Sequence, residues 1–302
     1  MSETLSNITT RAVLADLTIS QWSARKHDKR VSEEVAEQHG SDRDMGRFNK
    51  ALVDSVALKP VQQAASALRD WHYEQTLPWS DKGPRILPAA NYFVYTAGVR
   101  ERRAKFDAAV AVFLAAYDSH VADAERRLGS LFRPAEYPPA SKIARAFASK
   151  VDFEPMPDGA DFRVALGDVE VARIRAEFED RADAAIAEAT RSLWQRCYDA
   201  VSHMVERLNA YQRDPDTGKV TAPFRDSLVE NVRELVDLLP RLNLANDPAL
   251  EAMRRRIAAE LVGSEPQDLR DDDGLRNTVA RQAADILAAM SGYCGEMAEA
   301  AE

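Results

Sequence analysis

Two long, alanine-rich amphipathic stretches, residues 98–131 and 168–212, constrain the fold of this chain more than any other feature. In the first stretch, apolar residues recur at three-to-four spacing from Phe106 onward, the pattern of a helix with one core-facing side. The second stretch carries a similar apolar stripe, and alanine dominates its first half. Because small side chains let helix axes approach closely, we expect the two stretches to pack as a long antiparallel, coiled-coil-like hairpin.

The residues that connect these stretches, about 132–167, predict a small α+β head at the tip of the hairpin. Prolines interrupt the start of the connection, and residues 141–149 fit a short helical piece. Residues 151–166 alternate in polarity around an Asp-Gly turn, as a β-hairpin does. A further short strand is predicted over residues 13–20, where apolar residues recur with period two. Whether this strand joins the head hairpin is left open by the sequence.

The N-terminal segment, residues 1–97, combines short helices with a proline-rich loop. A short helix is expected to end near Gly40, and residues 47–75 show helical spacing in which Pro60 is expected to break or restart the helix. Residues 77–91 contain three prolines and one glycine, which excludes a regular helix and predicts an extended, ordered loop.

The C-terminal segment, residues 214–302, predicts three shorter helices near 223–240, 248–262 and 275–300. The Asp-Pro pair at 247–248 fits an N-cap followed by proline at the first helical position. The fold class is therefore mainly α, with a long helical hairpin, a small head and a C-terminal helical segment. The expected organisation has three consecutive parts: residues 1–97, residues 98–213 with the head at about 132–167, and residues 214–302.

Composition and missing motifs exclude several classes of function. With 45% hydrophobic and 29% charged residues the chain is globular, and its net charge of −9 argues against a general nucleic-acid coat. Cys197 and Cys294 lie far apart in helical patterns, as buried thiols of a reducing compartment do. The N-terminus has no apolar core of a signal peptide, and no apolar run approaches the length of a membrane span. We therefore expect an intracellular protein.

The sequence lacks the common patterns of enzymes and metal sites. It has no His-Glu-x-x-His or Cys-x-x-Cys pair, no nucleotide-binding glycine loop and no Gly-x-Ser-x-Gly elbow. The acidic run 271–274 lacks the alternation of a calcium loop, so we expect a solvated loop whose last aspartate caps the final helix. The prediction is a protein that is not an enzyme and that has no cofactor and no metal ion.

The proline-rich loop is the first candidate for a binding surface. Its candidate interaction residues are Trp79, Lys82, Arg85 and Tyr92, which combine aromatic and basic side chains. The competing interpretation is a structural clamp, because prolines lower the entropic cost of ordering such a loop. An enzymatic interpretation has only this loop and His72 as candidates.

A basic run just after Trp22 is the second candidate. It contains Arg25, Lys26, Lys29 and Arg30, and a run of this kind beside an aromatic residue can contact phosphates or stack on a base. The competing interpretation is an exposed charged loop held by one packed tryptophan.

The segments 17–22, 47–50, 76–79 and 85–92 resemble a family of tailed-phage and prophage proteins of unassigned function. The resemblance covers about residues 10–215. Members of that family are helical, non-enzymatic proteins whose genes often lie beside those of a MoxR-type AAA+ ATPase and a von Willebrand A protein. The resemblance implies an accessory or adaptor of such a system, located in the host cytoplasm, and it implies no functional residues.

These observations lead to two hypotheses for function. The first is a phage-encoded interaction or adaptor protein that docks on a protein partner, such as an AAA+ ATPase or a von Willebrand A protein, or on a second copy of itself. The second is a nucleic-acid-associated protein of phage replication or recombination, motivated by basic clusters at residues 25–30 and 100–105.

Overall fold

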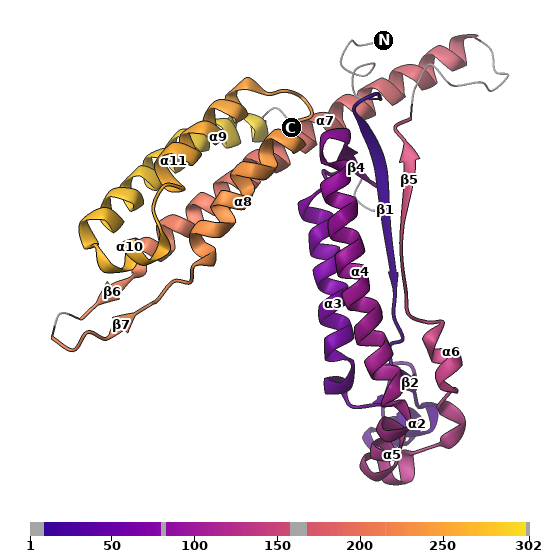
Figure 1. The fold of residues 1–302 in the computed structure, drawn as a ribbon. Coiled ribbons are helices and arrows are strands. Elements are labelled where there is room, and N and C mark those ends of the chain that lie inside the picture. The colour runs from indigo at the N-terminus through magenta and orange to yellow at the C-terminus, as the bar shows by residue number, and fades with distance from the viewer. Residues whose placement is uncertain (1–8, 80–82, 158–167, 215, 300–302) are drawn as a thin grey trace. The chain divides into compact units, whose positions relative to one another are not determined.

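The computed structural model describes residues 9–79, 83–157, 168–214 and 216–299, and it is mainly helical with a small antiparallel sheet (Figure 1). The contacts within the chain divide it into two compact units. Unit 1 comprises Met1–Ala15, Gln75–Phe93 and Phe153–Glu302, and unit 2 comprises Asp16–Glu74 and Val94–Asp152. Both units are thus discontinuous in sequence, whereas the sequence suggested three consecutive parts.

Unit 1 is built around four helices that lie side by side (Figure 1). Their bounds are α7 Asp168–Ala210, α8 Ser227–Leu242, α9 Pro248–Leu261 and α11 Asp273–Glu299. Helix α7 is 43 residues long and packs against α8 and α11, while α9 packs against α8 and α11 as well. A short helix, α10 (Pro266–Asp271), packs against α11. The three shorter helices expected near 223–240, 248–262 and 275–300 are therefore present.

Asp214 and Gly218 lie in the turn of a small hairpin between α7 and α8. Strand β6 (Gln212–Arg213) pairs antiparallel with β7 (Val220–Thr221). Asp214 Oδ1 accepts backbone hydrogen bonds from residues 216 and 217, each 2.9 Å long. Gly218 adopts a left-handed φ of 68°, which glycine reaches without strain. The segment therefore connects two helices within unit 1.

The core of unit 1 is organised around a tryptophan of α7. Trp194 is 2% exposed, and its ring stacks on Tyr293 of α11 with 4.6 Å between the ring centroids. Its Nε1 donates to Asp247 Oδ2 at 3.1 Å. The other carboxylate oxygen of Asp247 accepts from the backbone N–H groups of Ala249 and Leu250, so the predicted N-cap of α9 is confirmed.

The small sheet contains three strands in the order β4-β1-β5. Their bounds are β1 Ala12–Ser20, β4 Arg85–Pro88 and β5 Ala148–Pro155. Strand β1 pairs antiparallel with β4, with Ala12 opposite Pro88 and Ala15 opposite Arg85. The strand predicted over residues 13–20 is confirmed, and it joins the first strand of the expected head hairpin. The second strand of that hairpin was expected in residues that lie outside the described part of the chain.

Unit 2 contains short helices and strands around the paired helices α3 and α4. Its elements are α2 Lys29–His39, α3 Ser55–Glu74, α4 Tyr92–Ala115, α5 Tyr117–Leu128, α6 Ala140–Ala144, β2 Arg25–His27 and β3 Asn49–Ala51. Helix α4 begins in unit 1, at a 3₁₀ turn formed by Ala89–Asn91. Two further 3₁₀ turns, Gly129–Leu131 and Pro134–Glu136, follow α5. Val61 and Ala65 of α3 share a buried core with Phe106 and Phe113 of α4.

The predicted hairpin between residues 98–131 and 168–212 is not seen in the described part of the chain. The apolar stripe of α7 packs against α8 and α11 within unit 1, and that of α4 packs against α3 within unit 2. An amphipathic stripe predicts that one helix face is buried, but it does not identify the partner. The first stretch is also divided, because α4 ends at Ala115 and α5 begins at Tyr117.

The predicted helix over residues 47–75 is wrong at its start and at its proline. Residues 49–51 form strand β3, and α3 begins only at Ser55. Pro60 lies inside α3 without ending it. Proline at this position removes one bond to the carbonyl of Val56, and Val56 is 69% exposed, so water can satisfy that carbonyl.

No helix in the described residues is long and apolar enough to cross a membrane.

Candidate functional site

Two residues of the predicted interaction loop, Trp79 and Arg85, take part in structural contacts of unit 1. Arg85 Nε donates to Thr76 Oγ1 at 2.8 Å, and its Nη2 donates to the Thr76 carbonyl at 3.4 Å. Arg196 of α7 donates to the same carbonyl at 2.8 Å. Trp79 is partly buried against the core of unit 1. These contacts hold Trp79 and Arg85 in place on either side of residues 80–82, and Lys82 lies outside the described residues.

Tyr92, the fourth predicted residue of the loop, is half-buried and contacts two exposed aromatic side chains in unit 1. Its ring lies 5.5 Å from that of Phe93 and 5.3 Å from that of Phe153 on β5, measured between centroids. Phe93 is 82% exposed and Phe153 is 41% exposed. We call Tyr92, Phe93 and Phe153 the aromatic cluster. Tyr92 was predicted from the sequence as a residue of the interaction loop, but nothing in the sequence linked it to Phe153.

The structure places the predicted basic residues together on the surface of unit 2. Arg25 and Lys26 are in β2, and Lys29 and Arg30 open α2. All four are exposed. Arg30 pairs with Glu34 at 2.5 Å, whereas the other three have no ion-pair partner among the described residues. We call Arg25, Lys26, Lys29 and Arg30 the basic patch.

A buried lysine lies beneath the basic patch. Lys50 of β3 stands opposite Lys26 in the strand register, and its side chain is 1% exposed. Its Nζ lies 3.1 Å from Asp28 Oδ2 and 2.6 Å from Glu136 Oε2, and it donates to the Leu131 carbonyl at 2.8 Å. The hydrogen bond from Lys50 lowers the pKa of Asp28. The carboxylate of Asp28 is therefore paired with the buried Lys50.

His72, the only histidine with an enzymatic interpretation, is enclosed. It is 4% exposed, and its Nδ1 lies 2.8 Å from the hydroxyl oxygen of Tyr95. Burial raises the pKa of Tyr95 strongly, so this hydroxyl stays protonated. Neither group reaches the surface of the described structure, and both hold α3 and α4 together.

The neighbouring Trp71 explains a glycine of α4. A Cβ atom added at Gly98 would lie 2.2 Å from Cε2 of Trp71, so only glycine admits the indole at this position. Trp71 Nε1 donates to the Tyr95 carbonyl at 3.2 Å, and the guanidinium of Arg102 lies 3.9 Å above the ring. This arrangement is a structural contact between helices.

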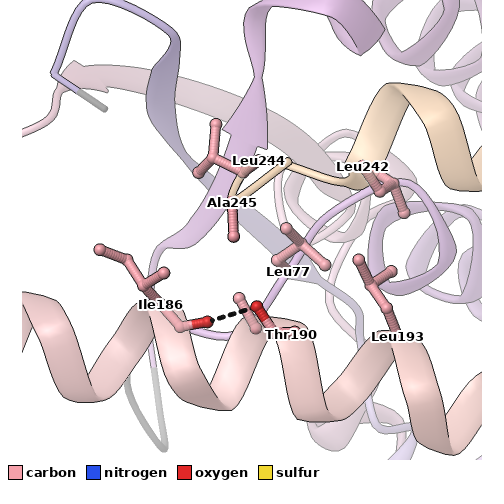
Figure 2. Close-up of a pocket in the computed structure, with 8 residues that line it drawn as sticks. Leu77, Ile186, Thr190, Leu193, Leu242, Leu244 and Ala245 are labelled. Carbon is pink, nitrogen blue, oxygen red and sulfur yellow. Dashed lines mark hydrogen bonds between the residues drawn. The ribbon is translucent and has the colours of Figure 1, made fainter. Parts of the chain in front are cut away.

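The apolar pocket of Figure 2 is part of the core of unit 1. Leu77, Ile186, Leu193, Leu242 and Leu244 converge on it, and the space between them leaves no volume for a water molecule (Figure 2). The one polar side-chain group shown is the hydroxyl of Thr190, and it donates to the Ile186 carbonyl at 3.0 Å. The pocket therefore cannot admit a ligand in this conformation.

A second cavity in unit 1 is open. It has a volume of about 430 Å³ and lies between the last turns of α7 and the first turns of α8. His203, Arg207 and Arg225 line it together with neutral polar and apolar side chains. This groove could not be predicted from the sequence, because its residues come from two segments that the expected fold did not bring together.

The acidic run at 271–274 serves to cap a helix. Residues up to Asp271 belong to α10, and Asp272 Oδ1 accepts from the N–H of Leu275 at 2.9 Å. The cap is therefore Asp272, one residue earlier than predicted, and Asp273 is already the first residue of α11. The described residues contain no group of three or more histidine, cysteine or acidic side chains arranged to hold a metal ion. Cys197 is a buried free thiol in the core of unit 1.

Comparison with known proteins adds no family to these observations. No protein-family model matches the chain, no curated protein sequence matches it, and no solved structure matches its fold. The function is therefore inferred from the residues of this chain alone.

Proposed function

We propose that this chain is a non-enzymatic interaction protein that docks on a protein partner through the aromatic cluster. The observation that carries the proposal is the exposure of Phe93, which is 82% accessible at the start of α4. Leaving a large apolar ring in water forgoes about 2 kcal/mol of burial free energy, so an exposed aromatic group of this kind is typical of interfaces.

The geometry of the cluster suits a docking role. Phe93 is in an edge-on contact with Tyr92, at an interplanar angle of 84°, and Tyr92 also contacts Phe153. Rings that support one another lose little rotamer freedom on binding, and aromatic residues are enriched among interface residues with large energetic effects. The base of the cluster is fixed, because Asn91 donates to the Gln75 carbonyl at 2.9 Å immediately before α4.

The resemblance to phage proteins supplies the partner to test. We propose an AAA+ ATPase of the MoxR type or a von Willebrand A protein as the partner, with a second copy of the chain as the other outcome. The experiment is affinity purification of the tagged protein from phage-infected cells, with mass spectrometry and a nuclease-treated sample. Wild type is compared with Phe93→Ser and with Met45→Ser, which removes an apolar side chain of similar exposure (78%) from unit 2.

The expected result is one defined partner that survives nuclease, is lost from Phe93→Ser and is retained by Met45→Ser. Sedimentation of the purified protein separates self-association from binding of another chain. Capture of the same partner by both variants would show that the cluster is not the docking surface.

The alternative function, association with nucleic acid, is favoured by one observation, the three cations of the basic patch that lack an acidic partner among the described residues. Release of counterions by Arg25, Lys26 and Lys29 predicts a slope of roughly −2.7 for log affinity against log salt on duplex DNA. Raising salt fourfold would then weaken binding about 40-fold. Reversing the charge of all three residues is expected to abolish the electrophoretic mobility shift of a labelled DNA duplex. A mobility shift that persists in the variant would show that the basic patch does not bind DNA.

A further inference from the structure

The open groove of unit 1 has a regular construction. His203 and Arg207 are four residues apart on α7, so they lie on the same face of that helix, one turn from each other. Ser227 and Asn231 are related in the same way on α8 and line the groove as well. The segment that leads into α8 contributes Arg225. The groove thus has one cationic wall, one neutral polar wall and a further cation where α8 begins.

The charge of the groove is of one sign. The residues that line it include His203, Arg207 and Arg225 and include neither aspartate nor glutamate. Asp226, the acidic neighbour of Arg225, is engaged by Arg270 from α10. The side chains of His203 and Arg225 make no hydrogen bond or ion pair with the described residues.

Arg207 is held in place while its charge remains unneutralised. Its Nη2 donates to the carbonyl of Pro223 at 2.5 Å, across the groove from α7 to the segment before α8. A carbonyl oxygen satisfies one donor of the guanidinium and leaves four. The apolar part of the lining comes from Phe224 and Leu228, and Phe224 is fixed from behind by the guanidinium of Arg270, 5.1 Å from its ring.

We propose that this groove binds the oxyanion head of a small amphipathic ligand, a phosphate or a carboxylate, with an apolar body against Phe224 and Leu228. Guanidinium groups match the geometry of both oxyanions and bind them with charge-assisted hydrogen bonds. The volume of about 430 Å³ lies in the range of small-molecule sites. The site is in unit 1 and involves no residue of the aromatic cluster, so it does not depend on the proposed function.

The test uses the full chain and three probes of one size, observed by ligand-detected NMR. Phenyl phosphate and benzoate carry the two oxyanions, and benzyl alcohol is the neutral control. The variant Arg225→Ala removes an exposed cation whose side chain makes no hydrogen bond or ion pair in the described structure. Arg281→Ala on α11 removes an exposed arginine that does not line the groove. Loss of one charge-assisted hydrogen bond is expected to weaken anion binding about tenfold.

Binding of either anion that weakens about tenfold in Arg225→Ala, and not in Arg281→Ala, supports the site. Tighter binding of phenyl phosphate assigns a phosphate ligand, and tighter binding of benzoate assigns a carboxylate. The proposal is overturned if neither anion binds at concentrations of about 10 mM, if benzyl alcohol binds as tightly, or if both arginine variants weaken binding equally. Capture of the protein partner is expected to be unchanged in Arg225→Ala, which separates this result from the test of the aromatic cluster.

Discussion

Replacing Lys50 with methionine is expected to destabilise unit 2 more than any surface change. Lys50 Nζ contacts Asp28, Glu136 and the Leu131 carbonyl, and the lysine side chain is 1% exposed. Methionine has a similar volume, so the packing is kept and the loss is polar. Removing the cation leaves the buried Asp28 carboxylate, the partly exposed Glu136 carboxylate and the Leu131 carbonyl without their donor. Breaking a buried pair from one side costs about 3–5 kcal/mol.

The assay is urea unfolding of the full chain at pH 7, together with hydrogen exchange of the peptide that spans α2. Exchange of that peptide separates unfolding of unit 2 from that of unit 1. The matched control is Lys59→Met, because Lys59 is an exposed lysine of α3, and its loss is expected to change stability by less than about 0.5 kcal/mol.

The same ion pair predicts a dependence on pH. Lys50 lowers the pKa of Asp28 below its ordinary value of 3.8, so the folded state favours the carboxylate. This stabilisation is complete above the ordinary pKa and is lost as the pH falls through the lower pKa of the folded state. The difference between wild type and Lys50→Met should therefore shrink when the pH is lowered from 7 to about 3. A loss below about 1 kcal/mol at pH 7, or an equal loss at both pH values, would refute the reasoning.

Three further substitutions test single contacts. Gly98→Ala should cost about 1–3 kcal/mol, because the new methyl group displaces Trp71 and breaks its indole hydrogen bond, and near-ultraviolet circular dichroism with thermal melting would detect both effects. Asp247→Ala removes the cap of α9 and the acceptor of Trp194, so we expect a loss of about 2–3 kcal/mol in urea unfolding, most of which Asp247→Asn should restore. Tyr137→Phe removes a buried hydroxyl that has no hydrogen-bond partner in the described structure, and its stability should be unchanged or up to about 1 kcal/mol higher; a clear loss in the same assay would show that the hydroxyl has a partner.

Three features of the helices could be predicted because their signals are local. The end of α2 follows from Gly40, whose φ of 61° is a conformation that glycine adopts readily. The start of α9 follows from the Asp-Pro pair at 247–248. The length of α7 follows from a continuous apolar stripe without proline or glycine. Each signal is contained in a few neighbouring residues, and none depends on the rest of the fold.

Helix pairing and the shortest strands could not be predicted for the opposite reason. The alanine-rich first half of α7 fits any close helix, so complementarity with the stretch at 98–131 was not specific. Strands β3 and β4 contain three and four residues, which is too short for alternation to be recognised. Their existence depends on partners that are distant in sequence, since β4 is placed by β1.

The candidate sites differ in the same way: features that are local in sequence could be predicted, and contacts between distant residues could not. The basic patch is contiguous in sequence, so its residue types could be recognised, although the buried ion pair that turns Asp28 inward could not. In the aromatic cluster, Tyr92 at the start of α4 contacts Phe153 of β5. This contact depends on the three-dimensional fold and could not be predicted from the sequence.

The distribution of charge between the two units also bears on whether the chain can bind nucleic acid. The net charge of −9 was used against binding to nucleic acid. All of that acidic excess falls on unit 1, whereas unit 2, which carries the basic patch, has slightly more basic than acidic residues. Screening in physiological salt limits electrostatic influence to about 8 Å, so phosphates at the patch would respond to local cations rather than to the charge of the whole chain. The net charge therefore says little about unit 2, and the salt dependence of binding by the basic patch is the observation that decides between the two functions.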